Sequence, residues 1–186
     1  MNSATTRERL VEHALVLIRQ RGYNGFSYRD LAERVGIKTA SIHYYFPSKD
    51  DLIVEAIGIY ADRDSSVLQR IDASLPADQR LDHYAALFHV APSDQVCLCG
   101  MLAADFASLS DRARQAVQSF YRMHEAWLTK VVADGQRDGT VSWAGTAEAA
   151  GRYLFAAFQG ALMRARLFQL TGQLKDVVDS VRTASR

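Results

Sequence analysis

Apolar residues recur at intervals of three and four along most of the chain, which is the spacing of one face of an α-helix. The first row begins after Thr5 or Thr6, either of which can cap a helix, and ends before Gly22. Alternation typical of strands is nearly absent, so we expect an all-α fold. The further helices are expected at about 27–35, 39–46, 49–73, 81–90, 96–106, 111–137 and 144–169, with a short last helix from 174.

Two short helices near the N-terminus are separated by a glycine. Ser27 can cap the first, Gly36 can take the left-handed conformation that ends it, and Pro47 stops the second. Ser48 with Asp51 then has the spacing of a capping box for the next helix. Helix, glycine turn and helix is the pattern of the helix-turn-helix, whose second helix enters the DNA major groove. An ordinary helical hairpin of a structural bundle would show the same pattern.

The side chains of the second short helix favour DNA binding over a structural hairpin. Ile42 and Phe46 lie four apart and can face inward, whereas Tyr44 and Tyr45 cannot both be buried in so short a helix. Tyrosine hydroxyls and the ammonium group of Lys49 can bind phosphate oxygens, which positions a protein on a duplex.

From Phe26 to Leu52, these motifs resemble the TetR family of bacterial transcriptional repressors, whose hallmark is an aromatic pair, Phe, a short gap, Lys and then an acidic residue with Leu. The resemblance covers about residues 7–60. It implies that the bases are contacted by Arg29, Thr39, Ala40 and His43, and the DNA backbone by Tyr28, Tyr44 and Lys49. Lys38 and Ser41 complete the predicted DNA-binding set. His43 stands where the family often has Tyr, and Lys38 where it often has Ser.

Charge and architecture fit two domains, a helix-turn-helix DNA-binding domain at 1–48 and a helical ligand-binding and dimerisation domain at 49–186. Residues 1–50 hold eight Lys/Arg against five Asp/Glu, a net +3, and residues 51–186 carry −2. The predicted helix 144–169 mixes aromatics with the small residues Gly151, Ala156, Ala157, Gly160 and Ala161. It packs either within its own chain or, as the resemblance favours, against the helix near 115–137 across a two-fold axis. A homodimer would bind a palindromic double-stranded DNA operator.

The central helices hold a candidate pocket for a small apolar inducer, with a few polar groups to orient it. The candidate ligand-binding residues are Cys97, Met101, Phe106, Tyr121, His124, Phe155, Phe158 and Gln159. The alternative is that these side chains are simply core.

Cys97 or Cys99 could instead sense an electrophile or oxidant, because a break at Pro92, Ser93 and Asp94 would place Cys97 in the first turns of its helix. A buried, inert cysteine is the simpler interpretation. Cys-x-Cys with distant histidines is a poor zinc pattern.

The sequence shows no Gly-rich phosphate loop, nucleophile elbow or metal-ligand set, so we expect neither an enzyme nor a cofactor. It has no apolar run long enough to span a membrane and no signal region, so a cytoplasmic protein without a membrane partner is expected. The expected function is a ligand-responsive transcriptional repressor. A ligand-independent DNA-binding regulator of the same fold, or an enzyme or carrier built on a helical bundle, are the alternatives.

Overall fold

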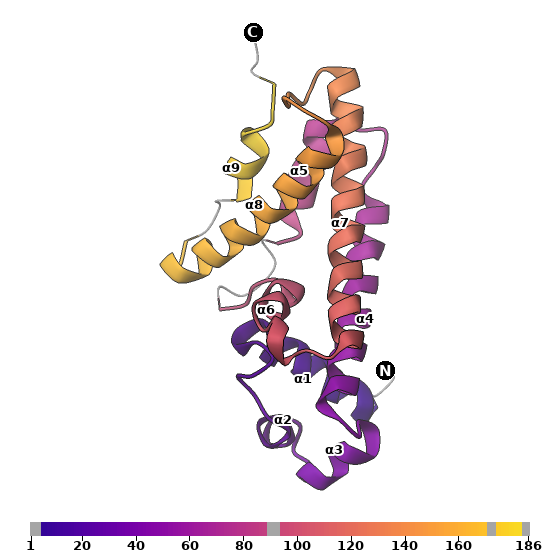
Figure 1. Ribbon diagram of the computed structural model, residues 1–186, viewed down its shortest axis with the longest axis vertical. Coiled ribbons are helices and arrows are strands. Elements are labelled where there is room, and N and C mark those ends of the chain that lie inside the picture. Colours follow the sequence, from indigo (N-terminus) through magenta and orange to yellow (C-terminus); the bar gives the residue numbers. More distant parts are fainter. Residues whose placement is uncertain (1–4, 89–93, 171–173, 184–186) are drawn as a thin grey trace. The chain divides into compact units, whose positions relative to one another are not determined.

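The computed structural model describes residues 5–88, 94–170 and 174–183, and these parts are almost entirely helical (Figure 1). The helices are α1 (Thr6–Arg21), α2 (Tyr28–Val35), α3 (Thr39–Tyr45), α4 (Lys49–Arg70), α5 (Ala77–Ala86), α6 (Leu98–Ala104), the 3₁₀ turn η1 (Phe106–Ser108), α7 (Asp111–Asp138), α8 (Ala147–Phe168) and α9 (Leu174–Asp179). Within the described parts the extended structure is confined to one isolated bridge between Val141 and Arg182. The expected all-α fold is confirmed.

The helix starts follow the capping chemistry that the sequence predicts. Thr5 and Glu8 form a capping box on α1, with the Thr5 amide donating to the Glu8 carboxylate at 2.6 Å. Ser27 caps α2, where Asp30 takes the place of Glu in the box. The Ser48 hydroxyl accepts the Asp51 amide at 3.2 Å, so α4 begins as expected. Each box satisfies amide groups that the first turn of a helix leaves unpaired.

Several predicted helix bounds are wrong. α5 begins at Ala77 instead of Leu81, so the polar run before Leu81 belongs to the helix and not to a separator. α6 covers only Leu98–Ala104, α4 stops at Arg70 and α8 starts after its cap, Thr146. The residues of α6 are almost all apolar, which favours a helix buried on every side, yet Ala104 is exposed.

The chain divides into two compact units, residues Met1–Asp62 with Cys97–Phe120, and Arg63–Val96 with Tyr121–Arg186. This division differs from the functional boundary expected at residue 48, because the first unit takes in the start of α4, all of α6 and the start of α7. In the first unit α1 packs against α2 and α6, and α2 packs against α3 (Figure 1). Its core includes Leu10, Leu17, Ile18, Leu31, Ile42, Phe46, Leu52 and Ile53, all of which are fully buried.

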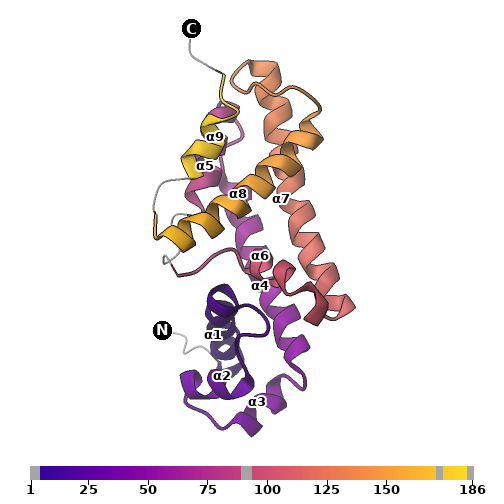
Figure 2. The same ribbon diagram turned by 60° about the vertical axis from the view of Figure 1, so that its left-hand side comes forward.

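In the second unit α9 packs against both α5 and α8 (Figure 2). The segment after α9 returns to the connection between α7 and α8, where the Ser142 amide donates to the Val181 carbonyl at 2.8 Å and the Thr183 amide to the Thr140 carbonyl at 3.0 Å. The core of this unit includes Leu81, Tyr84, Leu128, Val131, Leu154, Phe155 and Phe158.

Candidate functional site

The helix α3 presents most of its surface to solvent. Ile42 is fully buried and anchors the helix on the core, and Phe46, also fully buried, follows directly after it. Tyr44 is 84% exposed. The other exposed residues of the predicted DNA-binding set are Arg29, Lys38, Thr39, Ala40, Ser41 and His43. An exposed helix end rich in donors and acceptors can contact base edges and phosphates.

The turn between α2 and α3 has the geometry that the glycine predicts. Gly36 adopts φ 76° and ψ 38°, the left-handed region, and its amide donates to the Ala32 carbonyl at 2.9 Å. Lys38 occupies the N-cap of α3, and within the described chain its side chain makes no capping bond. The Lys38 side chain is exposed and is not engaged in capping the helix that it begins.

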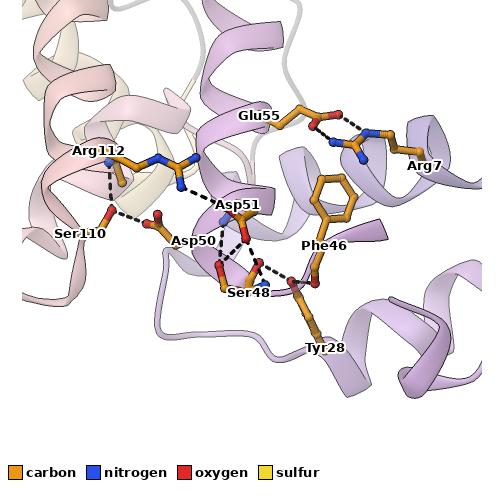
Figure 3. Close-up of polar contacts among 10 residues, drawn as sticks. Arg7, Tyr28, Phe46, Ser48, Asp50, Asp51, Glu55, Ser110 and Arg112 are labelled. Carbon is orange, nitrogen blue, oxygen red and sulfur yellow. Dashed lines mark hydrogen bonds and ion pairs between the residues drawn. The ribbon is translucent and has the colours of Figure 1, made fainter. Parts of the chain in front are cut away.

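Tyr28 and His43 meet between the start of α2 and the end of α3. Their rings contact edge to face, with centroids 5.0 Å apart. The Tyr28 hydroxyl lies 2.6 Å from the Ser48 carbonyl and 3.0 Å from the Phe46 carbonyl, so its proton can bond to either (Figure 3). Burial, with the nearby Asp51 carboxylate as a smaller cause, raises the pKa of Tyr28 to about 12. Tyr28 therefore remains a neutral hydroxyl that ties α2 to the turn after α3.

Lys49 is half-buried, and its ammonium group bonds the chain itself. Nζ donates to the carbonyls of Tyr23 and Phe26 and lies 4.1 Å from the centroid of the Phe26 ring. Burial lowers the pKa of Lys49, while the Asp105 carboxylate partly offsets this by raising it. The predicted phosphate contact stays a prediction, and any such contact would have to share Nζ with these two carbonyls.

Arg29 points away from the core, with its side chain 84% exposed. Its Nε donates to the carboxylate of Glu33, one turn further along α2, at 3.1 Å. This bond uses Nε of the guanidinium. The two terminal nitrogens remain available, and these are the pair that can bind the edge of a guanine base.

The second unit contains a buried polar line within an aromatic cluster. His124 is fully buried, with Nδ1 2.9 Å from the Tyr84 hydroxyl and Nε2 3.4 Å from an Asp64 carboxylate oxygen. The His124 ring stacks on Phe155, and Tyr84 stacks on Trp127. Asp64, which interrupts the apolar face of α4 in the sequence, therefore faces a buried partner.

The predicted ligand-binding residues fall in both units. Tyr121 contacts Phe155 edge to face, with ring centroids 4.8 Å apart, and Phe158 packs against Tyr84, so His124 and three others of the eight belong to one cluster. Gln159 is on the same helix as Phe155, and its buried Nε2 has no hydrogen-bond partner among the residues described. The other three belong to the first unit: Cys97 is buried, Met101 partly so, and Phe106 is 55% exposed beneath Arg114.

Sequence reasoning missed Asp64, Tyr84 and Phe88 as members of this cluster. The one usable signal was a carboxylate placed within an apolar helix face at Asp64, which predicts a buried polar partner.

The described part of the second unit includes two pockets that are not lined by the predicted ligand-binding residues. The larger, about 640 Å³, lies between the end of α4 and α5, and is lined by Val67, Arg70, Ile71, Asp72, Leu75, His83, Ala86 and Leu87. The other, about 560 Å³, lies at the start of α5, and is lined by Ala73, Ser74, Leu75, Pro76, Arg80, Asp134, Asp138 and Thr140. The lining of the first pocket is mostly apolar, with Arg70, Asp72 and His83 as its polar residues, which suits a small apolar molecule carrying a polar group.

Both cysteines are buried, Cys97 to 2% exposure and Cys99 to 0%, and no disulfide joins them. Pro92 and Ser93, which were expected to start the cysteine-bearing helix, lie outside the described residues. Across the ranges that the structure covers, no group of three potential metal ligands occurs. Over the same ranges, no helix has the length and apolar character that crossing a membrane requires.

Comparison with known proteins agrees with this geometry. Residues 10–56 match the model of bacterial regulatory proteins of the tetR family, and residues 78–181 match the tetracyclin repressor-like C-terminal domain. The HTH-type transcriptional repressor DhaR of Mycobacterium sp. (strain GP1) is 27% identical over 174 residues, which cover 90% of this chain and 85% of that protein.

Solved structures give the same result. A TetR transcriptional regulator from Legionella pneumophila is 32% identical over 97% of each chain, with a TM-score of 0.81. A TetR-family transcriptional regulator from Agrobacterium tumefaciens is 26% identical, with a TM-score of 0.87 over 96% of this chain and 98% of that one. These relatives are transcriptional regulators by name, and none is named as an enzyme.

Proposed function

Because the chain belongs to the TetR family of bacterial regulatory proteins, we propose that it is a ligand-responsive transcriptional repressor that binds a palindromic operator as a homodimer. The observation that carries this proposal is the exposed end of α3, where Tyr44 is 84% exposed and only Ile42 of the helix is buried. Two such helices in one dimer would enter adjacent major grooves, about 34–36 Å apart.

A selection from a random duplex library tests DNA recognition without a known operator. Wild-type protein should enrich a palindromic sequence, and its affinity should fall steeply as salt rises, because basic side chains displace counterions from the phosphates. Arg29→Ala should lose discrimination at one base pair, worth about 1–3 kcal/mol if the contact with guanine is bidentate. Glu148→Gln, an exposed change in the second unit, serves as the control. Failure to enrich any sequence at low salt would remove the proposal.

Dimer formation is supported by an exposed apolar face on α8. Tyr153, Met163, Leu167 and Phe168 are each about half exposed or more, and Gly160 faces open space. Gly151 instead packs closely on α7 of the same chain, where an added Cβ would lie 2.4 Å from Thr129 Oγ1. At the start of α8, the small residue Gly151 thus serves packing within the chain. We assign the exposed apolar face of α8 to the two-fold interface.

Release by a small molecule is supported by the second unit, which offers a largely apolar pocket of about 640 Å³. This volume lies within the range of small-molecule sites. An inducer must bind the form that does not fit the operator more tightly than the form that does, or the equilibrium will not shift. A screen of apolar metabolites by thermal stabilisation, followed by DNA release, tests this step. Stabilisation without any change in DNA affinity would contradict ligand control.

A further inference from the structure

His43 is held in the exposed end of α3 by contacts on two sides. Its Nδ1 lies 3.3 Å from the carbonyl oxygen of Pro47, four residues on. Its ring contacts the Tyr28 ring edge to face at 5.0 Å. Tyr28 is itself fixed, since its hydroxyl lies within hydrogen-bond distance of both carbonyls that flank Pro47 and can donate to either (Figure 3). The imidazole is therefore oriented before any ligand arrives.

The contact with Pro47 determines which ring nitrogen carries the proton. A carbonyl oxygen can only accept a hydrogen bond, so Nδ1 must be the donor. In a neutral imidazole the other nitrogen then has a lone pair and no proton. The Nδ1 contact thus makes Nε2 an acceptor, on a side chain that is exposed.

We propose that His43 is a specificity-determining residue whose Nε2 accepts a hydrogen bond from the exocyclic amino group of adenine or cytosine in the major groove. This inference rests on the proposed DNA binding. At the base that His43 faces, guanine O6 and thymine O4 are acceptors and would repel the Nε2 lone pair. A tyrosine hydroxyl at this position could donate as well as accept a hydrogen bond, so the histidine restricts the bases that this position can contact.

The tautomer can be tested on the free protein, without DNA. Long-range proton–nitrogen NMR correlation on the full-length chain distinguishes an Nδ1–H from an Nε2–H imidazole. His43→Phe identifies the signal by its disappearance and keeps a ring against Tyr28. We expect the ring proton on Nδ1, and a ring that carries its proton on Nε2 instead would overturn the inference.

The base contact is tested on the duplex enriched by the wild type. One base pair should lose its preference in His43→Phe, and the wild type should prefer adenine or cytosine there. Replacing that base with an analogue that lacks only the amino group should weaken wild-type binding by about two- to tenfold, the range of one net hydrogen bond. The same replacement should leave His43→Phe binding unchanged.

The outcomes separate this inference from the proposed function. A wild type that binds no duplex overturns both. A wild type that binds a specific duplex, but whose base preferences all survive in His43→Phe, overturns the role of His43 alone. A preference for guanine or thymine at the affected position also overturns it, because those bases present an acceptor to the groove.

Discussion

The carboxylate of Asp105 accepts the backbone N–H of Tyr23 at 2.7 Å, joining two segments that are 82 residues apart in the sequence. Its second oxygen accepts the Asn24 side-chain amide at 3.1 Å, and Asn24 also donates to Ser108 at 2.8 Å. Gly22 permits this approach, since an added Cβ would lie 2.4 Å from the Asp105 carboxylate. The end of α6 is thereby tied to the turn between α1 and α2.

Asp105→Ala should destabilise the protein by about 1–3 kcal/mol, because the partly buried Tyr23 amide loses its acceptor. Chemical denaturation followed by circular dichroism measures the change. Asp111→Ala is the matched control, since Asp111 is exposed and, among the residues described, forms a local ion pair with Arg114, three residues on. Equal stability of the two variants would show that the Tyr23 contact contributes nothing beyond a surface ion pair.

Arg7 joins α1 to the end of α3 and to α4. Its guanidinium bonds the Glu55 carboxylate through two nitrogens (Figure 3). A third nitrogen donates to the Tyr45 carbonyl at 3.1 Å. It also lies over the Phe46 ring at 4.5 Å. The Arg7 side chain is 48% exposed, so solvent screens the pair, and we expect Arg7→Ala to cost only about 1 kcal/mol.

The measurement for Arg7 is thermal unfolding at low and high salt. Arg7→Lys keeps the charge but cannot bond both carboxylate oxygens and the carbonyl together, so it should recover less than half of the loss. Full recovery in Arg7→Lys would show that charge alone matters at this position.

Much of the first unit was predictable because its determinants are local. Capping residues, Gly36 and Pro47 set the helix ends from their immediate neighbours, and the pair Ile42 and Phe46 identified the inward face of the short helix. The second unit was harder, because its bounds depend on distant partners. Arg80 looks like a polar linker residue in the sequence, yet it is 4% exposed and bonds Asp134.

Prediction of the candidate site from the sequence was limited in the same way, because contacts with distant segments could not be predicted. Exposure of the α3 residues followed from the helical period, whereas the partners of Lys49 and Asp64 depend on how remote segments pack. Composition alone identified the aromatic residues but not which of them gather around His124.

Glu33 places a negative charge beside Arg29 on the surface that we assign to DNA. The pair is exposed, so its loss should leave stability within about 0.5 kcal/mol. Glu33→Gln should bind unrelated duplexes more tightly, because one charge that repels the phosphates is removed. Titrations of specific and random duplexes at several salt concentrations give the ratio of affinities. An affinity for random duplexes unchanged from the wild type at every salt concentration would place Glu33 away from the DNA.

Asp134 pairs with the buried Arg80 at 2.8 Å, and that bond, with a smaller contribution from Arg137, lowers the pKa of Asp134. A carboxyl group whose pKa is lower in the folded chain stabilises the fold above its unfolded pKa of about 3.9. The stabilising contribution of Asp134 is lost as the pH falls through the pKa that this carboxyl group has in the folded chain. Stability should therefore decrease progressively below about pH 4.

Asp134→Asn should lack this part of the acid dependence. At pH 7 it should be less stable by roughly 2–4 kcal/mol, because the buried Arg80 loses its countercharge. Unfolding free energies of both proteins from pH 7 to pH 3 measure the difference, which should shrink as the pH falls. A constant difference across that range would mean that Asp134 does not titrate with folding.

Gly160 and Gly58 provide a matched pair for testing the dimer face. Both glycines are exposed within long helices, and an added Cβ meets nothing within 4 Å at either position. Leucine should stabilise an exposed helix interior relative to glycine by about 0.8 kcal/mol. Gly58→Leu should therefore be more stable than the wild type and remain a dimer.

Gly160→Leu inserts a large side chain into the proposed two-fold contact, so analytical ultracentrifugation should show a weaker dimer, and operator affinity should fall with it. Unchanged self-association in Gly160→Leu would exclude this face of α8 as the interface.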